Sequence, residues 1–179
     1  MKRSLEQALL DLRQHVSAWA LGGAKPGIYI FVYPAEWEAP MLARLPDFVA
    51  DCTAAGWPVE LVDVGQGFAR ELERRQGLIG QLVAQEAEGA ERPRHDLGIL
   101  GERYLARAMR AVPQAPMVAR LFVNTGALAT FVSYSAILSA ISGEELPSPT
   151  VFAFPGEDDE RSLNLLGLRA DTNYRLPRI

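Results

Sequence analysis

The sequence holds few of the side chains that metal and disulfide chemistry require. It contains one cysteine, Cys52, and two widely separated histidines, His15 and His95. A single cysteine excludes an internal disulfide and a multi-thiolate zinc site, and the absence of a His-x-x-x-His pair disfavours a hydrolytic zinc site. We therefore expect no metal and no cofactor, with Cys52 in the core and His15 packed or solvated on a helix face.

Lysine is also scarce: Lys2 and Lys25 are the only two, and the other sixteen of the 18 basic residues are arginines. A phosphate-binding P-loop needs a lysine followed by Ser or Thr, but Pro26 follows Lys25, so this stretch is predicted to be a helix-to-strand turn. With 22 acidic residues the formal net charge is −4. Direct nucleic-acid binding is therefore disfavoured, and the arginines at 74–75 and 92–94 have acidic neighbours that favour a solvated face.

Long hydrophobic runs are missing as well. No window approaches the roughly 18 uninterrupted apolar residues of a membrane span, and charges interrupt the N-terminal stretch where a secretory signal would be apolar. We therefore expect a cytoplasmic protein with no membrane contact. The 179 residues, 49% of them hydrophobic, can bury one substantial core and predict a single domain over 1–179.

Short β-branched or aromatic runs alternate with helical patterns along the chain. The runs that predict strands are 28–33, 58–64, 117–123 and 150–154. Apolar stripes at helical spacing predict helices at 5–22, 40–55, 68–83, 97–112 and 128–141, and a short helix at 161–166. This alternation predicts an α/β fold with a mainly parallel central sheet of about four or five strands and helices on both faces.

Helix ends, prolines and loops complete this prediction. Ser4, with Gln7 three residues later, predicts a capping box at the first helix. Pro46 is compatible with its helix only in the first turn. The polar stretch 87–96 is predicted to be a mobile loop and 171–179 a C-terminal tail, while Pro155 and Gly156 are predicted to end the fourth strand.

Loops at the carboxyl ends of parallel strands carry function in such folds. After the third strand, Asn124, Thr125 and Gly126 form a turn that could hold an anion or a nucleotide, although a plain strand-to-helix turn capped by Thr125 is commoner. Asp63 is placed for a ribose or magnesium contact or, more commonly, for capping the next helix. A degenerate nucleotide-binding or phosphoryl-transfer module is therefore the alternative function.

Other catalytic patterns are incomplete. Gly65 and Gly67 form only the front half of a dinucleotide fingerprint, because Arg70 stands where the third glycine belongs. No Gly-x-Ser-x-Gly elbow exists, and Ser133 lies in a predicted helix. The acidic run 157–160 could hold a cation or stabilise the first turn of the short helix through its dipole. No catalytic set emerges, and we expect a protein that is not an enzyme.

The stretch 154–175, FPGEDDERSLNLLGLRADTNYR, resembles the C-terminal signature of the BrxB domain family, small proteins of bacterial BREX bacteriophage-exclusion systems. The matching residues, in order and spacing, are Phe154, Pro155, Gly156, Ser162, Leu163, Asn164, Leu165, Gly167, Asn173, Tyr174 and Arg175. Weaker matches extend over most of the chain. The chain departs from the family in its single tyrosine, where the family has two, and in its acidic EDDE linker.

The resemblance implies a non-catalytic interaction or regulatory component of a BREX-type phage-defence complex. Such a component would act by binding a PglZ-type, alkaline-phosphatase-like protein of the same system. The motif residues are candidate binding residues on this resemblance, although such a motif more often marks the fold than the function. The implied role agrees with the absence of a catalytic set in the residues.

Overall fold

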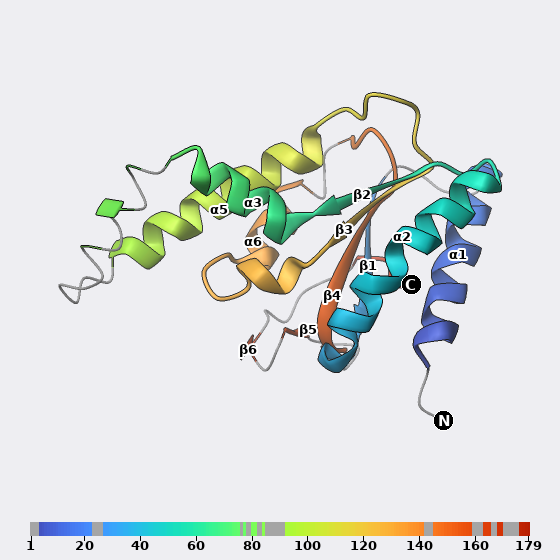
Figure 1. Ribbon diagram of the computed structural model, residues 1–179, viewed down its shortest axis with the longest axis horizontal. Helices are drawn as coiled ribbons and strands as arrows, with labels where there is room; N and C mark the ends of the chain where they lie inside the picture. Colours follow the sequence, from blue (N-terminus) through green and yellow to red (C-terminus); the bar gives the residue numbers. More distant parts are fainter. Residues whose placement is uncertain are drawn as a thin grey trace.

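The centre of the molecule is a sheet of parallel strands with helices on both faces (Figure 1). The computed structural model describes residues 4–22, 27–75, 77, 80–81, 84, 92–141, 145–158, 163–165, 168–169 and 176–179. The parallel strands are β1 (Ile28–Tyr33), β2 (Val59–Asp63), β3 (Ala119–Val123) and β4 (Thr150–Asp158). They lie in the order β2-β3-β4-β1, since β4 pairs with both β1 and β3, and β2 pairs with β3. The predicted α/β fold is confirmed.

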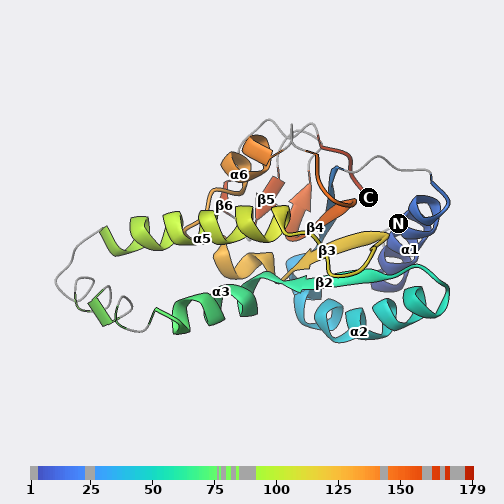
Figure 2. The ribbon, with the colours of Figure 1, turned by 90° about the horizontal axis from the view of Figure 1, so that it is seen from above.

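The helices form two layers, one on each side of the sheet (Figure 2). The first layer consists of α1 (Leu5–Ala20) and α2 (Glu38–Ala54). The second consists of α3 (Val64–Glu73), α5 (Arg92–Arg110) and α6 (Tyr134–Ile141). Two short 3-10 helices, η1 (Ala35–Trp37) and η2 (Thr125–Leu128), follow β1 and β3.

Burial on both faces explains why the strands are apolar at both parities of the sequence. All five residues of β3 are buried. Phe122 and Phe152 stack with ring centroids 4.9 Å apart on the side of α5 and α6, whereas Leu121 and Val151 pack toward α1 and α2. A continuous apolar run is the pattern that a covered parallel sheet requires.

The ends of the first two helices follow the sequence closely. Ser4 caps α1, because its Oγ accepts a hydrogen bond from the Gln7 backbone at 3.2 Å. The Gln7 side chain completes no capping box and donates instead to Asp11. Gly22 and Gly56, with φ of 84° and 82°, adopt the left-handed conformation just beyond α1 and α2.

Three predictions about helix positions are wrong. Pro46 lies inside α2 and not in its first turn, so the helix tolerates one missing backbone donor. α5 begins at Arg92, with Pro93 in its first turn, so the predicted loop cannot include 92–96, while 87–91 lies outside the described residues. The helix predicted over 128–141 is broken, because the turn at 129–131 separates η2 from α6.

The fourth strand is also longer than predicted. β4 continues through Pro155 and Gly156 to Asp158 and pairs antiparallel with β5 (Leu163–Leu165), which in turn pairs with β6 (Leu168–Arg169). The helix predicted at 161–166 is therefore wrong. Pro155 fits a strand here because β3 pairs with β4 only as far as Phe152, so the edge of β4 facing β3 needs no donor at Pro155.

The described end of the tail covers the outer edge of β1. The Ile30 backbone donates to the Pro177 carbonyl, and the Ile179 backbone donates to the Ile30 carbonyl, both at 2.9 Å. This bridge is parallel. Residues 171–175 of the predicted tail lie outside the described part of the chain.

Helices α3 and α5 run side by side and extend beyond the sheet as a helical arm (Figure 2). Glu71 of α3 joins them by accepting from Arg107 of α5 at 3.0 Å. Along α5, a Cβ on Gly98 would lie 2.5 Å from the Phe131 carbonyl oxygen, and one on Gly101 would lie 2.5 Å from the Val132 side chain. These glycines allow α5 to pack against the chain that precedes α6.

A buried cation holds the end of α5 against the sheet. Arg120 of β3 is 3% exposed, and its Nε lies 2.5 Å from a Glu60 carboxylate oxygen of β2. Its Nη1 donates to the carbonyls of Met109 and Ala111, each at 3.0 Å. Those carbonyls would otherwise be orphaned at the helix terminus. Arg120 therefore links two strands and a helix.

Replacing Arg120 should destabilise the protein strongly. We expect Arg120→Met to lower the free energy of unfolding by about 3 kcal/mol, because it leaves Glu60 and two carbonyls without their partner. Urea denaturation measures this loss. The control is Arg103→Met, an exposed arginine of α5, with an expected change within about 0.5 kcal/mol. Equal losses in the two variants would contradict the role given to Arg120.

Candidate functional site

The carboxyl ends of β2 and β3 bring two candidate side chains together. Asp63 ends β2 and caps α3, since its Oδ1 accepts from the Gln66 backbone at 2.8 Å. The same oxygen accepts from Asn124 Nδ2 at 3.1 Å. The predicted capping role of Asp63 is confirmed, and the contact with Asn124 is one that the sequence did not reveal.

The candidate anion turn is held to the sheet by its own side chains. Asn124 adopts the left-handed conformation, with φ of 54° and ψ of 35°. Thr125 is completely buried, and its hydroxyl donates to the Ala153 carbonyl of β4 at 2.7 Å, so it does not cap η2. The Tyr134 hydroxyl donates to the Thr125 carbonyl. The turn at Gly126 thus opens one short 3-10 helix and not a long α-helix with a substantial dipole.

The two glycines after β2 serve close packing. A Cβ on Gly65 would lie 2.5 Å from Asn124 Nδ2, and one on Gly67 would overlap the Tyr104 hydroxyl of α5. Neither glycine needs a positive φ, since the described glycines with that conformation are Gly22 and Gly56. The incomplete dinucleotide motif is therefore explained by contacts between α3, η2 and α5.

An acidic side chain missed by the sequence analysis lies at the same edge. Glu38, the first residue of α2, accepts a hydrogen bond from the Tyr33 hydroxyl at the end of β1. Its other oxygen is buried without a hydrogen-bond partner among the described residues. Burial raises the pKa of Glu38, and the nearby negative charge of Asp63 raises it further, whereas the hydrogen bond from Tyr33 lowers it. Its signal in the sequence is only a glutamate shortly after a strand-ending tyrosine.

The tyrosines around this edge share the same environment. The pKa values of Tyr33 and Tyr134 are both raised, chiefly by burial, and the charge of Glu38 adds to each. Burial also raises the pKa of Tyr104, with a further contribution from Asp63. All three hydroxyls therefore stay protonated, and those of Tyr33 and Tyr134 donate hydrogen bonds to Glu38 and to the Thr125 carbonyl.

The remaining candidates for acid, base or metal chemistry are dispersed. His15 Nδ1 lies 3.0 Å from the Asp11 carbonyl oxygen, and His95 is exposed on α5. Cys52 is completely buried, as predicted for a core residue, and burial raises its pKa. Among the described residues no group of three His, Cys, Asp or Glu side chains could hold a metal ion. No described helix has the length and apolar character needed to cross a membrane.

The residues that carry the family resemblance are only partly described. Phe154 is buried, with its ring centroid 5.2 Å from that of Tyr134, and Pro155 is buried beside it. Gly156 pairs with β5. Within the acidic run, residues 157–158 pair with β5 and do not open a helix. Leu163, Asn164 and Leu165 form β5. The remaining motif positions, Ser162, Gly167, Asn173, Tyr174 and Arg175, lie outside the described residues.

Comparison of the chain with protein-family models, curated proteins and solved structures finds no match. The resemblance to the BrxB domain family therefore stays a prediction from the residues at 154–175.

Adding a methyl group at Gly67 should destabilise the packing of α3 on α5. We expect Gly67→Ala to lower the free energy of unfolding by about 2 kcal/mol, because the new Cβ overlaps the Tyr104 hydroxyl. Adding Tyr104→Phe should recover part of this loss by removing the oxygen. Thermal unfolding of the single and double variants measures both effects. Gly80→Ala is the control, since its Cβ would meet nothing within 4 Å; no recovery in the double variant would contradict the contact.

Removing the charge of Glu38 should stabilise the protein at alkaline pH. A carboxyl whose pKa is raised by folding keeps its proton longer in the folded state, so stability falls as pH rises from the ordinary pKa of 4.5 through the raised value. We expect Glu38→Gln to raise the melting temperature at pH 8 by about 2 °C, and to have little effect near pH 4. The exposed Glu36→Gln is the control. Lower stability of Glu38→Gln at pH 8 would refute this assignment.

Proposed function

We propose that this chain is a non-catalytic interaction component of a BREX-type phage-defence complex, acting in the cytoplasm by binding a PglZ-type, alkaline-phosphatase-like partner. The motif at 154–175 suggests the system. The observation that supports a binding role is that the polar side chains at the carboxyl edge of the sheet are hydrogen-bonded to other parts of the same chain.

This edge is where α/β enzymes place their ligands. Here one carboxylate oxygen of Asp63 accepts two hydrogen bonds, one from the backbone in the first turn of α3 and one from the Asn124 side-chain amide. The Thr125 hydroxyl is committed to the carbonyl of Ala153. A phosphate that used these groups would have to replace bonds that hold α3, η2 and β4 together. The polar groups at this edge therefore stabilise the fold, which favours a protein that acts through its surface by binding a partner.

The distribution of charge also supports recognition of a protein partner. The whole chain has a formal net charge of −4, yet α5 carries five arginines and only two acidic residues. Charge segregated on one projecting helix steers a complementary surface during association and restricts the choice of partner. The helical arm is thus the part of the described surface best suited to such contact.

Binding to the PglZ-type protein of the same defence system tests the proposal. We expect co-purification and saturable binding by surface plasmon resonance, with a Kd of about 1 μM or tighter. A monodisperse protein that shows no binding at a partner concentration about a hundredfold above this Kd would contradict the proposal. Calorimetry with ATP, GTP and magnesium runs beside it: heat at millimolar nucleotide, without binding to the PglZ-type protein, would favour the nucleotide-binding alternative.

A further inference from the structure

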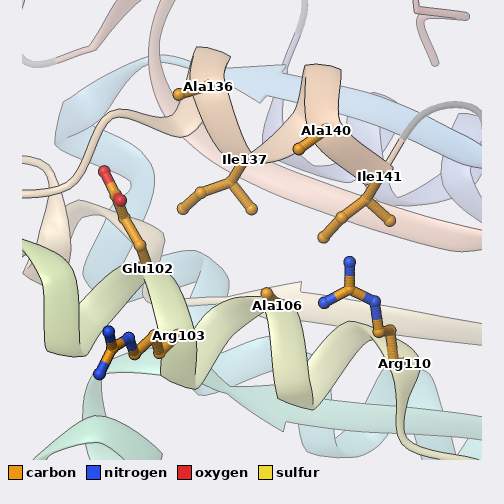
Figure 3. Close-up of a pocket in the computed structure, with 8 residues that line it drawn as sticks. All are labelled: Glu102, Arg103, Ala106, Arg110, Ala136, Ile137, Ala140 and Ile141. Carbon is orange, nitrogen blue, oxygen red and sulfur yellow. The ribbon is translucent and has the colours of Figure 1, made fainter.

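A hollow of about 360 Å³ lies between α5 and α6 (Figure 3). Its lining residues are Glu102, Arg103, Ala106, Arg110, Ala136, Ile137, Ala140 and Ile141. Ile137 and Ile141 point from α6 toward α5, with Ala106 opposite them. Ala136 and Ala140 are exposed on the α6 side. The hollow therefore combines an apolar floor with small side chains at its opening.

Arginines continue from this hollow along the exposed surface of α5. Arg103, Arg107 and Arg110 follow at spacings of four and three residues, which places them on one face of the helix. A second hollow, of about 540 Å³, is lined by these three arginines together with Ala106 and Ala111. Three guanidinium groups thus border an apolar depression.

Charged side chains lie at both ends of the hollow, with Glu102 and Arg103 at one end and Arg110 at the other (Figure 3). Glu102 rises from α5 toward Ala136 at one end, and Arg110 rises toward Ile141 at the other (Figure 3). The nine residues from Glu102 to Arg110 span about 12 Å along α5, which matches roughly two turns of a bound helix.

We propose that this hollow is the docking site for an acidic amphipathic segment of a protein partner. Apolar side chains of the segment would contact the alanines at 106, 136 and 140, which lie over the buried Ile137 and Ile141. Its carboxylates would contact Arg103 and Arg110. Small side chains at 106, 136 and 140 let a partner backbone approach closely. This is the helix-in-groove mode of recognition, with charge complementarity selecting the partner. Only the assignment of the segment to the PglZ-type protein rests on the proposed function.

The chemistry of the hollow fits a peptide better than a nucleic acid. A nucleic-acid backbone gains from cations but not from the apolar side chains that line the hollow. An acidic peptide with apolar anchors uses both the arginines and the floor.

Selection of peptides tests the docking site without assuming the partner. Random peptides of about 16 residues, long enough for four helical turns, are displayed on phage and selected on the full-length protein. Binders that also retain affinity for Ala140→Trp, in which an indole fills the hollow, are removed. We expect the enriched peptides to combine Asp or Glu with Leu, Phe or Trp at helical spacing. No enrichment, or enrichment of basic peptides, would overturn the proposal.

Matched variants then locate the bound peptide. Fluorescence polarisation should show at least a tenfold loss of affinity in Ala140→Trp and in Arg103→Glu. The same two changes on the opposite layer, Ala43→Trp and Arg44→Glu, affect exposed residues of α2 and should leave affinity unchanged. Equal losses in both pairs would refute the site. So would duplex DNA that binds more tightly than the peptides and is lost in Arg103→Glu.

The PglZ-type protein provides a separate outcome. If it binds the wild type and loses at least tenfold affinity in Ala140→Trp and Arg103→Glu, the docking site belongs to the proposed complex. Binding that both variants leave intact would overturn its assignment to this hollow while the proposed function stands. Peptide binding without any binding of the PglZ-type protein would overturn the proposed function and support the site alone.

Discussion

The burial of the Arg120 charge determines where α5 ends and therefore where the helical arm begins. A guanidinium that is 3% exposed is stable only if its donors are satisfied, and here a carboxylate of β2 and two carbonyls at the end of α5 satisfy them. The sheet edge and the helix terminus are thus joined at one point. Gly98 and Gly101, which pack against the chain before α6, allow α5 to approach that segment closely.

The sequence predicted those features that depend on neighbouring residues. Apolar runs at both parities indicated covered parallel strands, and Ser4 and Asp63 indicated helix starts, because a cap acts within a few residues of its own position. The predicted end of the fourth strand at Pro155 was wrong, because it depended on a neighbouring strand that is distant in the sequence. Whether a proline can stand in a strand depends on the strand beside it, and β3 stops pairing with β4 before Pro155.

The candidate site was predictable only in part, because its contacts join residues that are far apart in the chain. Asp63 and Asn124 were each singled out, but their hydrogen bond arises from the pairing of β2 with β3. Gly67 resembles part of a nucleotide-binding motif in the sequence, whereas in the structure it allows close packing against Tyr104 of α5. The hollow between α5 and α6 carries no motif, since alanines and isoleucines at helical spacing are typical of any packed helix.

The position of β1 sets the order in which this sheet can be completed. Its two partners, β4 and the segment at Pro177–Ile179, both come from the last fifth of the chain. A nascent chain therefore carries an apolar strand with two unpaired edges until residues 150–179 have left the ribosome. Contacts of such large sequence separation slow folding, and open strand edges promote association between chains. Both edges of β1 are therefore open to association with other chains until residues 150–179 have been synthesised.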